Sequence, residues 1–214
     1  MKFDKGIAKK YRKSIDDAFE SILNIGNDGH RRVANAILDS EMTICVHPVS
    51  KVNASGITGL IDLDRTNQRI SDERLGLVDA LSEVFITIAE ETIDNGGQRG
   101  CEGTLVHEGR HAYDYGRAIE SFSNADINPL GLFDPNGFEL EWEAHCAAAE
   151  YMLLAGRDEY IQEGLDLMVL CRENGECSVF PDGIKQRLKN CYGTDAVENP
   201  GTTMSENWGL IPKL

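Results

Sequence analysis

Residues 107–111 read His-Glu-Gly-Arg-His, which places two histidines four positions apart with a glutamate beside the first. On a helix, positions i and i+4 lie on the same face, so both imidazoles can reach one metal ion at about 2.0–2.1 Å. Glu108 points about 100° around the helix from His107. From there its carboxylate can take a proton from a water molecule that zinc activates. The pattern therefore predicts His107 and His111 as metal ligands and Glu108 as a general base.

A catalytic zinc ion needs a third protein ligand and keeps one position for water. The strongest acidic candidates lie within residues 138–150, where three glutamates alternate among alanines and aromatic residues. Glu141 shares a helical face with Ala144, and small side chains on that face would allow a second helix to approach closely. We expect Glu141 to be the third ligand. Glu143 and His145 are the alternatives.

The combination of His107-Glu108-x-x-His111 with Glu141-x-x-Ala144, thirty residues after the second histidine, resembles the gluzincin zinc metallopeptidases. In that family the third ligand is a glutamate on a later helix. The resemblance implies a zincin-like fold and one zinc ion (Zn2+) per chain. It implies that His107, His111 and Glu141 hold the metal and that Glu108 is the catalytic base.

The run from residue 107 to residue 115 is also similar to the corresponding helix of lethal-factor-type bacterial toxin proteases. The whole resemblance covers about residues 80–155. It implies a zinc metalloendopeptidase that acts on a protein or peptide substrate, as a bacterial toxin or effector that a cognate inhibitor or immunity protein would restrain. The alternative is a zincin-like metal-binding protein that acts as a binding module without turnover.

One position departs from the family pattern. Several gluzincins carry an acid or amide four residues after the third ligand, where this chain has His145. Either another group orients His107, or His145 itself contacts the site. Asp114, one turn beyond His111, is either an acceptor for a metal-bound imidazole or a solvated helix residue. The candidates for stabilising an oxyanion are Tyr113, Tyr115, Tyr151, Arg110 and His145.

The elements that must position these residues follow from hydrophobic spacing and from helix-ending glycines. The predicted helices are an amphipathic segment over residues 3–23, then 32–39, 104–115 ending at Gly116, 138–155 ending at Gly156, and 158–170. Strands are predicted at 42–49 and 84–89, with a half-exposed strand within 53–70. The tail beyond Cys191 should be irregular and should dock through Trp208, Leu210 and Ile211.

This order of elements favours one α+β domain over residues 1–214, zincin-like, with a small mixed sheet. An all-helical domain is the alternative. By the gluzincin resemblance, a substrate peptide would add to an edge strand, which we expect at residues 59–64 or 84–89.

The net charge and the lengths of the apolar runs limit the kinds of partner and the cellular location that we expect. The chain has 36 acidic residues against 21 lysines and arginines, a net charge of −15 that disfavours nucleic acid as a substrate. No apolar run approaches the ~20 residues that a membrane span needs, and none follows the basic N-terminus to form a signal peptide. We therefore expect cytoplasmic synthesis, and for an effector a secretion route that needs no signal peptide.

Among the six cysteines, Cys171 and Cys177 flank a turn and could form a local disulfide in an oxidising compartment.

Overall fold

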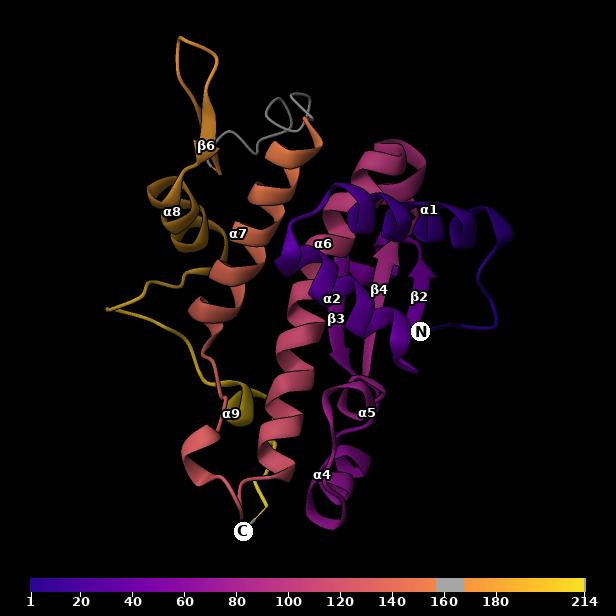
Figure 1. Cartoon of the computed structure of the whole chain (residues 1–214), viewed down its shortest axis with the longest axis vertical. Coiled ribbons are helices and arrows are strands. Elements are labelled where there is room, and N and C mark those ends of the chain that lie inside the picture. Colours follow the sequence, from indigo (N-terminus) through magenta and orange to yellow (C-terminus); the bar gives the residue numbers. More distant parts are fainter. Residues whose placement is uncertain (157–167, 214) are drawn as a thin grey trace.

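The computed structural model describes residues 1–156 and 168–213 and has an α+β fold (Figure 1). Its main sheet has four strands in the order β1 (Lys2–Phe3), β2 (Thr43–His47), β4 (Val84–Ala89) and β3 (Gly56–Leu60). β1, β2 and β4 run parallel, whereas β3 pairs with β4 in the antiparallel sense. The predicted small mixed sheet is confirmed, and the all-helical alternative is wrong.

One face of the sheet packs against the helices. Along β2, Ile44 and Val46 are buried, while the three residues that alternate with them are more exposed. α1 (Lys9–Ile25) buries Ile15, Phe19 and Ile22 in the same core, and α2 (Asp28–Asp39) follows it. Both helices contact α6 (Glu90–Ser123), the longest helix of the described chain. The helices and one sheet face therefore share the main hydrophobic core.

Two local predictions need correction because caps were missed. α2 begins four residues earlier than predicted, since the Asn27 side chain accepts a hydrogen bond from the His30 amide and His30 Nδ1 accepts one from the Asn27 amide. Within residues 53–70 only β3 is a strand. The Asp62 side chain caps α4 (Leu63–Asp72) by accepting a hydrogen bond from the Arg65 amide. The alternation of apolar and acidic residues at 61–64 therefore crosses a helix boundary.

α6 is much longer than the predicted helix over residues 104–115. It starts directly after β4 and has a kink at Gly97, whose φ is +60°. It also runs through Gly116, which was expected to end it. A Cβ atom at Gly116 would lie 3.0 Å from the Leu81 side chain of α5 (Leu77–Leu81), so this glycine permits close helix packing.

α7 (Gly137–Ala155) matches the predicted helix over residues 138–155. Asn136 caps its start and Gly156 ends it in the left-handed conformation, as predicted. A 3-10 turn, η1 (Pro129–Gly131), lies in the connection from α6. α6 and α7 pack against each other and lie side by side in Figure 1. The two helices that carry the predicted ligands are therefore neighbours.

The last part of the chain is more regular than predicted. The helix expected over residues 158–170 lies mostly outside the described residues, and its last two positions belong to β5 (Val169–Cys171). β5 pairs with β6 (Cys177–Val179), and a Cys171–Cys177 disulfide, which the sequence left as a possibility, joins them. α8 (Pro181–Tyr192) follows the hairpin. A second core joins these elements to α7, with buried residues Phe138, Ala149, Met152, Met168, Val169, Ile184 and Leu188.

The tail after Cys191 forms one further short helix, α9 (Met204–Trp208). A short helix earlier in the chain, α3 (Val49–Val52), follows β2. Trp208 packs edge-on against Tyr115 at 4.3 Å between ring centroids, and Leu210 is buried, as predicted. Ile211 is 63% exposed, so its predicted docking is wrong. The other four cysteines are free thiols: Cys45, Cys101, Cys146 and Cys191.

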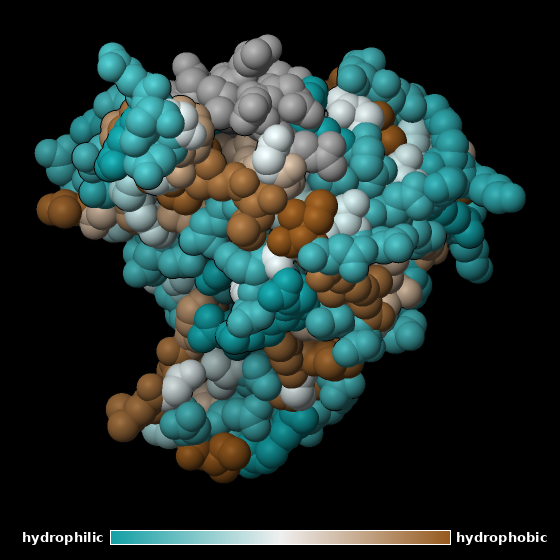
Figure 2. All heavy atoms as spheres, turned by 45° about the horizontal axis from the view of Figure 1, so that its top comes forward, coloured by the Kyte–Doolittle hydropathy of each residue, from teal (hydrophilic) through white to brown (hydrophobic). Residues whose placement is uncertain are grey.

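On the face shown in Figure 2, hydrophobic side chains lie in separate groups between hydrophilic ones. Among the described helices, none combines the length and the apolar character that a membrane crossing requires.

A buried ion-pair network joins α4 to the start of β4 and gives a stability prediction. The fully buried Glu83 carboxylate accepts hydrogen bonds from Arg69 at 2.6 Å and Arg65 at 2.8 Å. Glu83→Gln removes this charge, and we expect it to lower the free energy of unfolding by about 1.5–3 kcal/mol. Glu73, an exposed partner of Arg69, provides the control. Glu73→Gln should cost much less in denaturant unfolding, and equal costs would contradict the prediction.

Candidate metal centre

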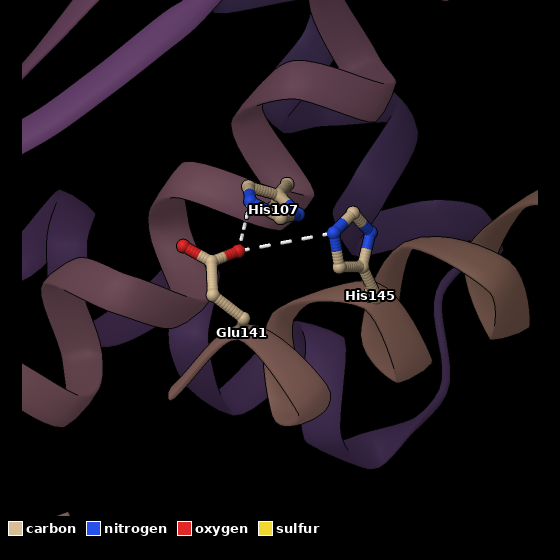
Figure 3. Close-up of side chains that lie close together, drawn as sticks. All are labelled: His107, Glu141 and His145. Carbon is tan, nitrogen blue, oxygen red and sulfur yellow. Dashed lines mark ion pairs between the residues drawn. The ribbon is translucent and has the colours of Figure 1, made fainter. Parts of the chain in front are cut away.

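Five side chains from two helices meet where α6 packs against α7. α6 contributes His107, Glu108 and His111, and α7 contributes Glu141 and His145. The helices can approach because Ala144, between the two α7 side chains, is fully buried and small. Figure 3 shows the Glu141 carboxylate pointing between the rings of His107 and His145.

The donor atoms lie at the spacing of a metal site. The Nε2 atoms of His107 and His111 are 3.2 Å apart. Glu141 Oε2 is 3.6 Å from His107 Nε2, and Glu141 Oε1 is 3.5 Å from His111 Nε2. A tetrahedral ion with bonds of about 2.0–2.1 Å separates its ligand atoms by about 3.3–3.4 Å. The spacing of the three predicted ligands is therefore close to that of a shared ion, with His107 next to one carboxylate oxygen of Glu141 and His111 next to the other.

Several buried polar atoms of this cluster have no hydrogen-bond partner within the described part of the chain. They are His111 Nδ1, Glu141 Oε2 and His145 Nε2. Buried polar atoms are almost always satisfied, because leaving one unpaired costs about 1–3 kcal/mol. A cation among them would provide a partner for the carboxylate oxygen and the imidazole nitrogen. This observation, independent of the motif, fits a metal ion.

The electrostatic setting favours the protonation states that bind metal. Burial lowers the pKa of His107 well below its usual value and lowers that of His145 to about 4. Burial also acts to lower the pKa of His111, but the Glu141 carboxylate beside it raises that pKa overall. Two of the three imidazoles are thus neutral at pH 7, the form that coordinates metals.

Glu108 lies beside the edge strand of the sheet. The Thr58 hydroxyl of β3 donates a hydrogen bond to Glu108 Oε2 at 2.8 Å, and burial raises the pKa of the Glu108 carboxyl. At Gly56 a Cβ atom would come within 2.8 Å of Glu108 Cγ, so this glycine lets the strand approach the helix. β3 is therefore the strand edge next to the site. The alternative edge at residues 84–89 is wrong, because β4 pairs with strands on both sides.

A groove of about 410 Å³ opens beside the cluster. His107, Glu108 and His145 line it on one side, and Arg187 and Tyr192 of α8 line it on another. The Tyr192 ring packs edge-on against His145 at 5.8 Å between centroids, and burial, followed by the charge of Glu141, raises the pKa of its phenol. Sequence reasoning missed both α8 residues because it predicted no helix there. Pro181 at the first turn and Gly193 directly after the last residue were the available signals.

The remaining predicted residues lie elsewhere. Glu143 Oε2 is 3.2 Å from an Arg110 guanidinium nitrogen, and Arg110 Nε donates a hydrogen bond to Asp114 at 2.8 Å. Asp114 thus contacts an arginine and is buried, so it is neither a solvated residue nor hydrogen-bonded to an imidazole, the two alternatives that the sequence left open. Tyr151 is fully buried and its hydroxyl donates to Glu102, which removes it as a candidate for contacting substrate.

Tyr115, another oxyanion candidate, stacks beside His111 at 6.2 Å between ring centroids and also packs against Trp208. Burial raises the pKa of its phenol. It does not line the groove described above, whereas Tyr192 does. Tyr192, and not Tyr115, is therefore the tyrosine that lies on the groove beside His145.

Comparisons with known proteins returned no match: no family model, no curated protein and no solved structure is similar to this chain. The site must therefore be interpreted from its own geometry.

Proposed function

We propose that the protein is a zinc-dependent endopeptidase with a zincin-like fold. The observation that carries this proposal is the position of the Glu141 carboxylate, whose oxygens lie 3.5 and 3.6 Å from His111 and His107. Two imidazoles and one carboxylate form a frequent protein ligand set for hydrolytic zinc. The gluzincin resemblance of the sequence supports the same ligands.

Each side chain has a role in this proposal. His107, His111 and Glu141 would hold the ion, and zinc would supply Lewis-acid activation of water and of the scissile carbonyl. Glu108 would accept the proton of the attacking water and pass it to the leaving amine. Its carboxylate stands beside the groove while bonded to Thr58, so the base is oriented but is not needed as a ligand.

The geometry of β3 supports a peptide as the substrate. β3 forms an edge of the sheet next to Glu108, where an extended peptide can add as a further strand through main-chain hydrogen bonds. The adjoining groove of about 410 Å³ can receive a large side chain. A delivered bacterial toxin or effector with a cognate inhibitor or immunity protein is the biological setting that the lethal-factor resemblance suggests.

A metal-binding module without turnover is the second candidate function. It is favoured by His145, whose Nε2 atom lies 3.8 Å from the Glu141 carboxylate and so approaches the position that water would take. A site filled by protein ligands is typical of structural zinc. The retained Glu108, which no structural site needs, favours the peptidase.

The test of function is cleavage that depends on both the metal and the base. The purified protein is incubated with unfolded casein and with a mixed proteome, with and without a chelator, beside its Glu108→Gln variant. We expect new peptide termini only with the unmodified protein in the absence of chelator. Cleavage that persists in the variant or in the chelator comes from another enzyme. Zinc binding without any cleavage favours the binding module.

Tyr192 provides a prediction about the transition state. Its phenol lies on the groove next to His145, where it can donate a hydrogen bond to a developing oxyanion. We expect Tyr192→Phe to lower kcat by about 10²-fold with little change in KM, because loss of one such donor costs about that factor. Tyr113→Phe is the control and should keep full activity. Unchanged kcat in Tyr192→Phe, measured with a cleaved peptide, would remove this role.

A further inference from the structure

His145 lies one helical turn after Glu141 and faces the same carboxylate oxygen as His107. Its Nε2 atom is 3.8 Å from Glu141 Oε2, compared with 3.6 Å for His107. The rings of His107 and His145 are 4.7 Å apart between centroids, the same separation as the rings of His107 and His111. The donor atoms of His107, Glu141 and His145 all lie within 4.8 Å of one another.

His145 is also not engaged as a core histidine usually is. Its Nε2 atom is buried and has no hydrogen-bond partner among the described residues. His30 shows the contrast, since its Nδ1 atom accepts from the Asn27 amide and its Nε2 atom contacts the Ala147 carbonyl oxygen at 2.8 Å. Both histidines are about 5% exposed. Only His145 directs an unpaired nitrogen towards the Glu141 carboxylate (Figure 3).

We propose that His145 is a fourth protein ligand, so that the bound ion is held by three imidazoles and one carboxylate. The inference rests on the metal site proposed above and does not depend on turnover. Four protein donors fill a tetrahedral shell. Water then reaches the ion only as a fifth ligand or after His145 has moved away. His145 would thus close the resting site. A substrate would have to displace His145 from the ion or bind the ion alongside it.

Counting the bound imidazoles in the unmodified protein tests the proposal without any variant. The chain has five histidines, and ¹⁵N-labelled ring nitrogens can be followed by NMR as zinc is added. We expect one equivalent of zinc to shift the Nε2 resonances of three histidines and to leave those of His30 and His47 unchanged. Shifts of only two histidines, those of His107 and His111, would overturn the fourth ligand.

Zinc affinity provides the second measurement. His145→Ala should weaken zinc binding by more than 100-fold in competition with a chelator, because loss of an indirect partner costs only about 10- to 100-fold. His47→Ala is the matched control, since it removes an exposed imidazole on β2 that is not part of the cluster. Equal affinities of the two variants contradict the proposal.

These outcomes separate the ligand proposal from the proposed peptidase. Three shifted histidines without chelator-sensitive cleavage support the fourth ligand and contradict the enzyme. Two shifted histidines with cleavage support the enzyme and contradict the fourth ligand. A protein that binds no zinc under either measurement contradicts both.

Discussion

Glu108→Gln should reduce chelator-sensitive cleavage by about 10²–10⁴-fold and leave the zinc content unchanged. The cluster contains two glutamates. Glu108 lines the groove, whereas Glu141 faces the imidazole nitrogens of His107 and His111. Glutamine keeps its size and can still accept the hydrogen bond from Thr58, but it cannot accept the proton of water. Chemistry should therefore fail while metal binding and folding persist.

Two quantities are measured for each protein: kcat and the zinc content by elemental analysis. Zinc per chain is determined after purification without added metal, and kcat is measured on a peptide that the unmodified protein cleaves. Glu143→Gln serves as the control, because Glu143 contacts Arg110 and does not line the groove beside the proposed metal site. Loss of zinc from Glu108→Gln would mean that the roles of Glu108 and Glu141 are wrongly assigned.

The sequence could predict that His107 and His111 lie side by side because their geometry is local. A four-residue interval on a helix puts His107 and His111 on one face wherever that helix lies, and the structure has their Nε2 atoms 3.2 Å apart. Glu141 required one further step, the close packing of a second helix along Ala144. That step relied on the small side chain of Ala144, which can be read from the sequence.

The contribution of α8 could not be derived in the same way. Tyr192 reaches the site through the second core, in which Ile184 and Leu188 pack against Met152 of α7. That contact joins segments more than thirty residues apart, and local spacing carries no information about it. The same reason explains Gly116. Its role depends on Leu81 of another helix, so a glycine that resembled a helix end lies inside α6.

The ion pairs around Glu143 also show why the structure was needed to decide which face of α7 points to the imidazoles. Glu141 and Glu143 differ by about 200° around α7. The structure directs Glu141 to the imidazoles and pairs Glu143 with Arg110, which also bonds to the buried Asp114. The competing arrangement, in which Glu143 faces the metal, would require α7 to rotate and would break this ion pair.

The last prediction follows from that arrangement. Glu141→Ala should weaken zinc binding by more than 100-fold, because it removes the carboxylate that faces both His107 and His111. Glu143→Ala is the matched control and should bind zinc like the unmodified protein. Affinities are measured by competition with a chelator. Thermal unfolding of the metal-free proteins tests whether both variants fold.

The two glutamates lie two residues apart on α7 and face different partners, so the comparison helps to separate ligation from the loss of a charge. Each substitution removes one negative charge from the same helix, and long-range electrostatic effects on zinc affinity are therefore nearly matched. If Glu141→Ala retained the affinity of Glu143→Ala, the carboxylate would not be a ligand and the gluzincin interpretation would fail with it. A large loss in Glu141→Ala alone would leave one carboxylate, supplied by α7, as the acidic ligand of the site.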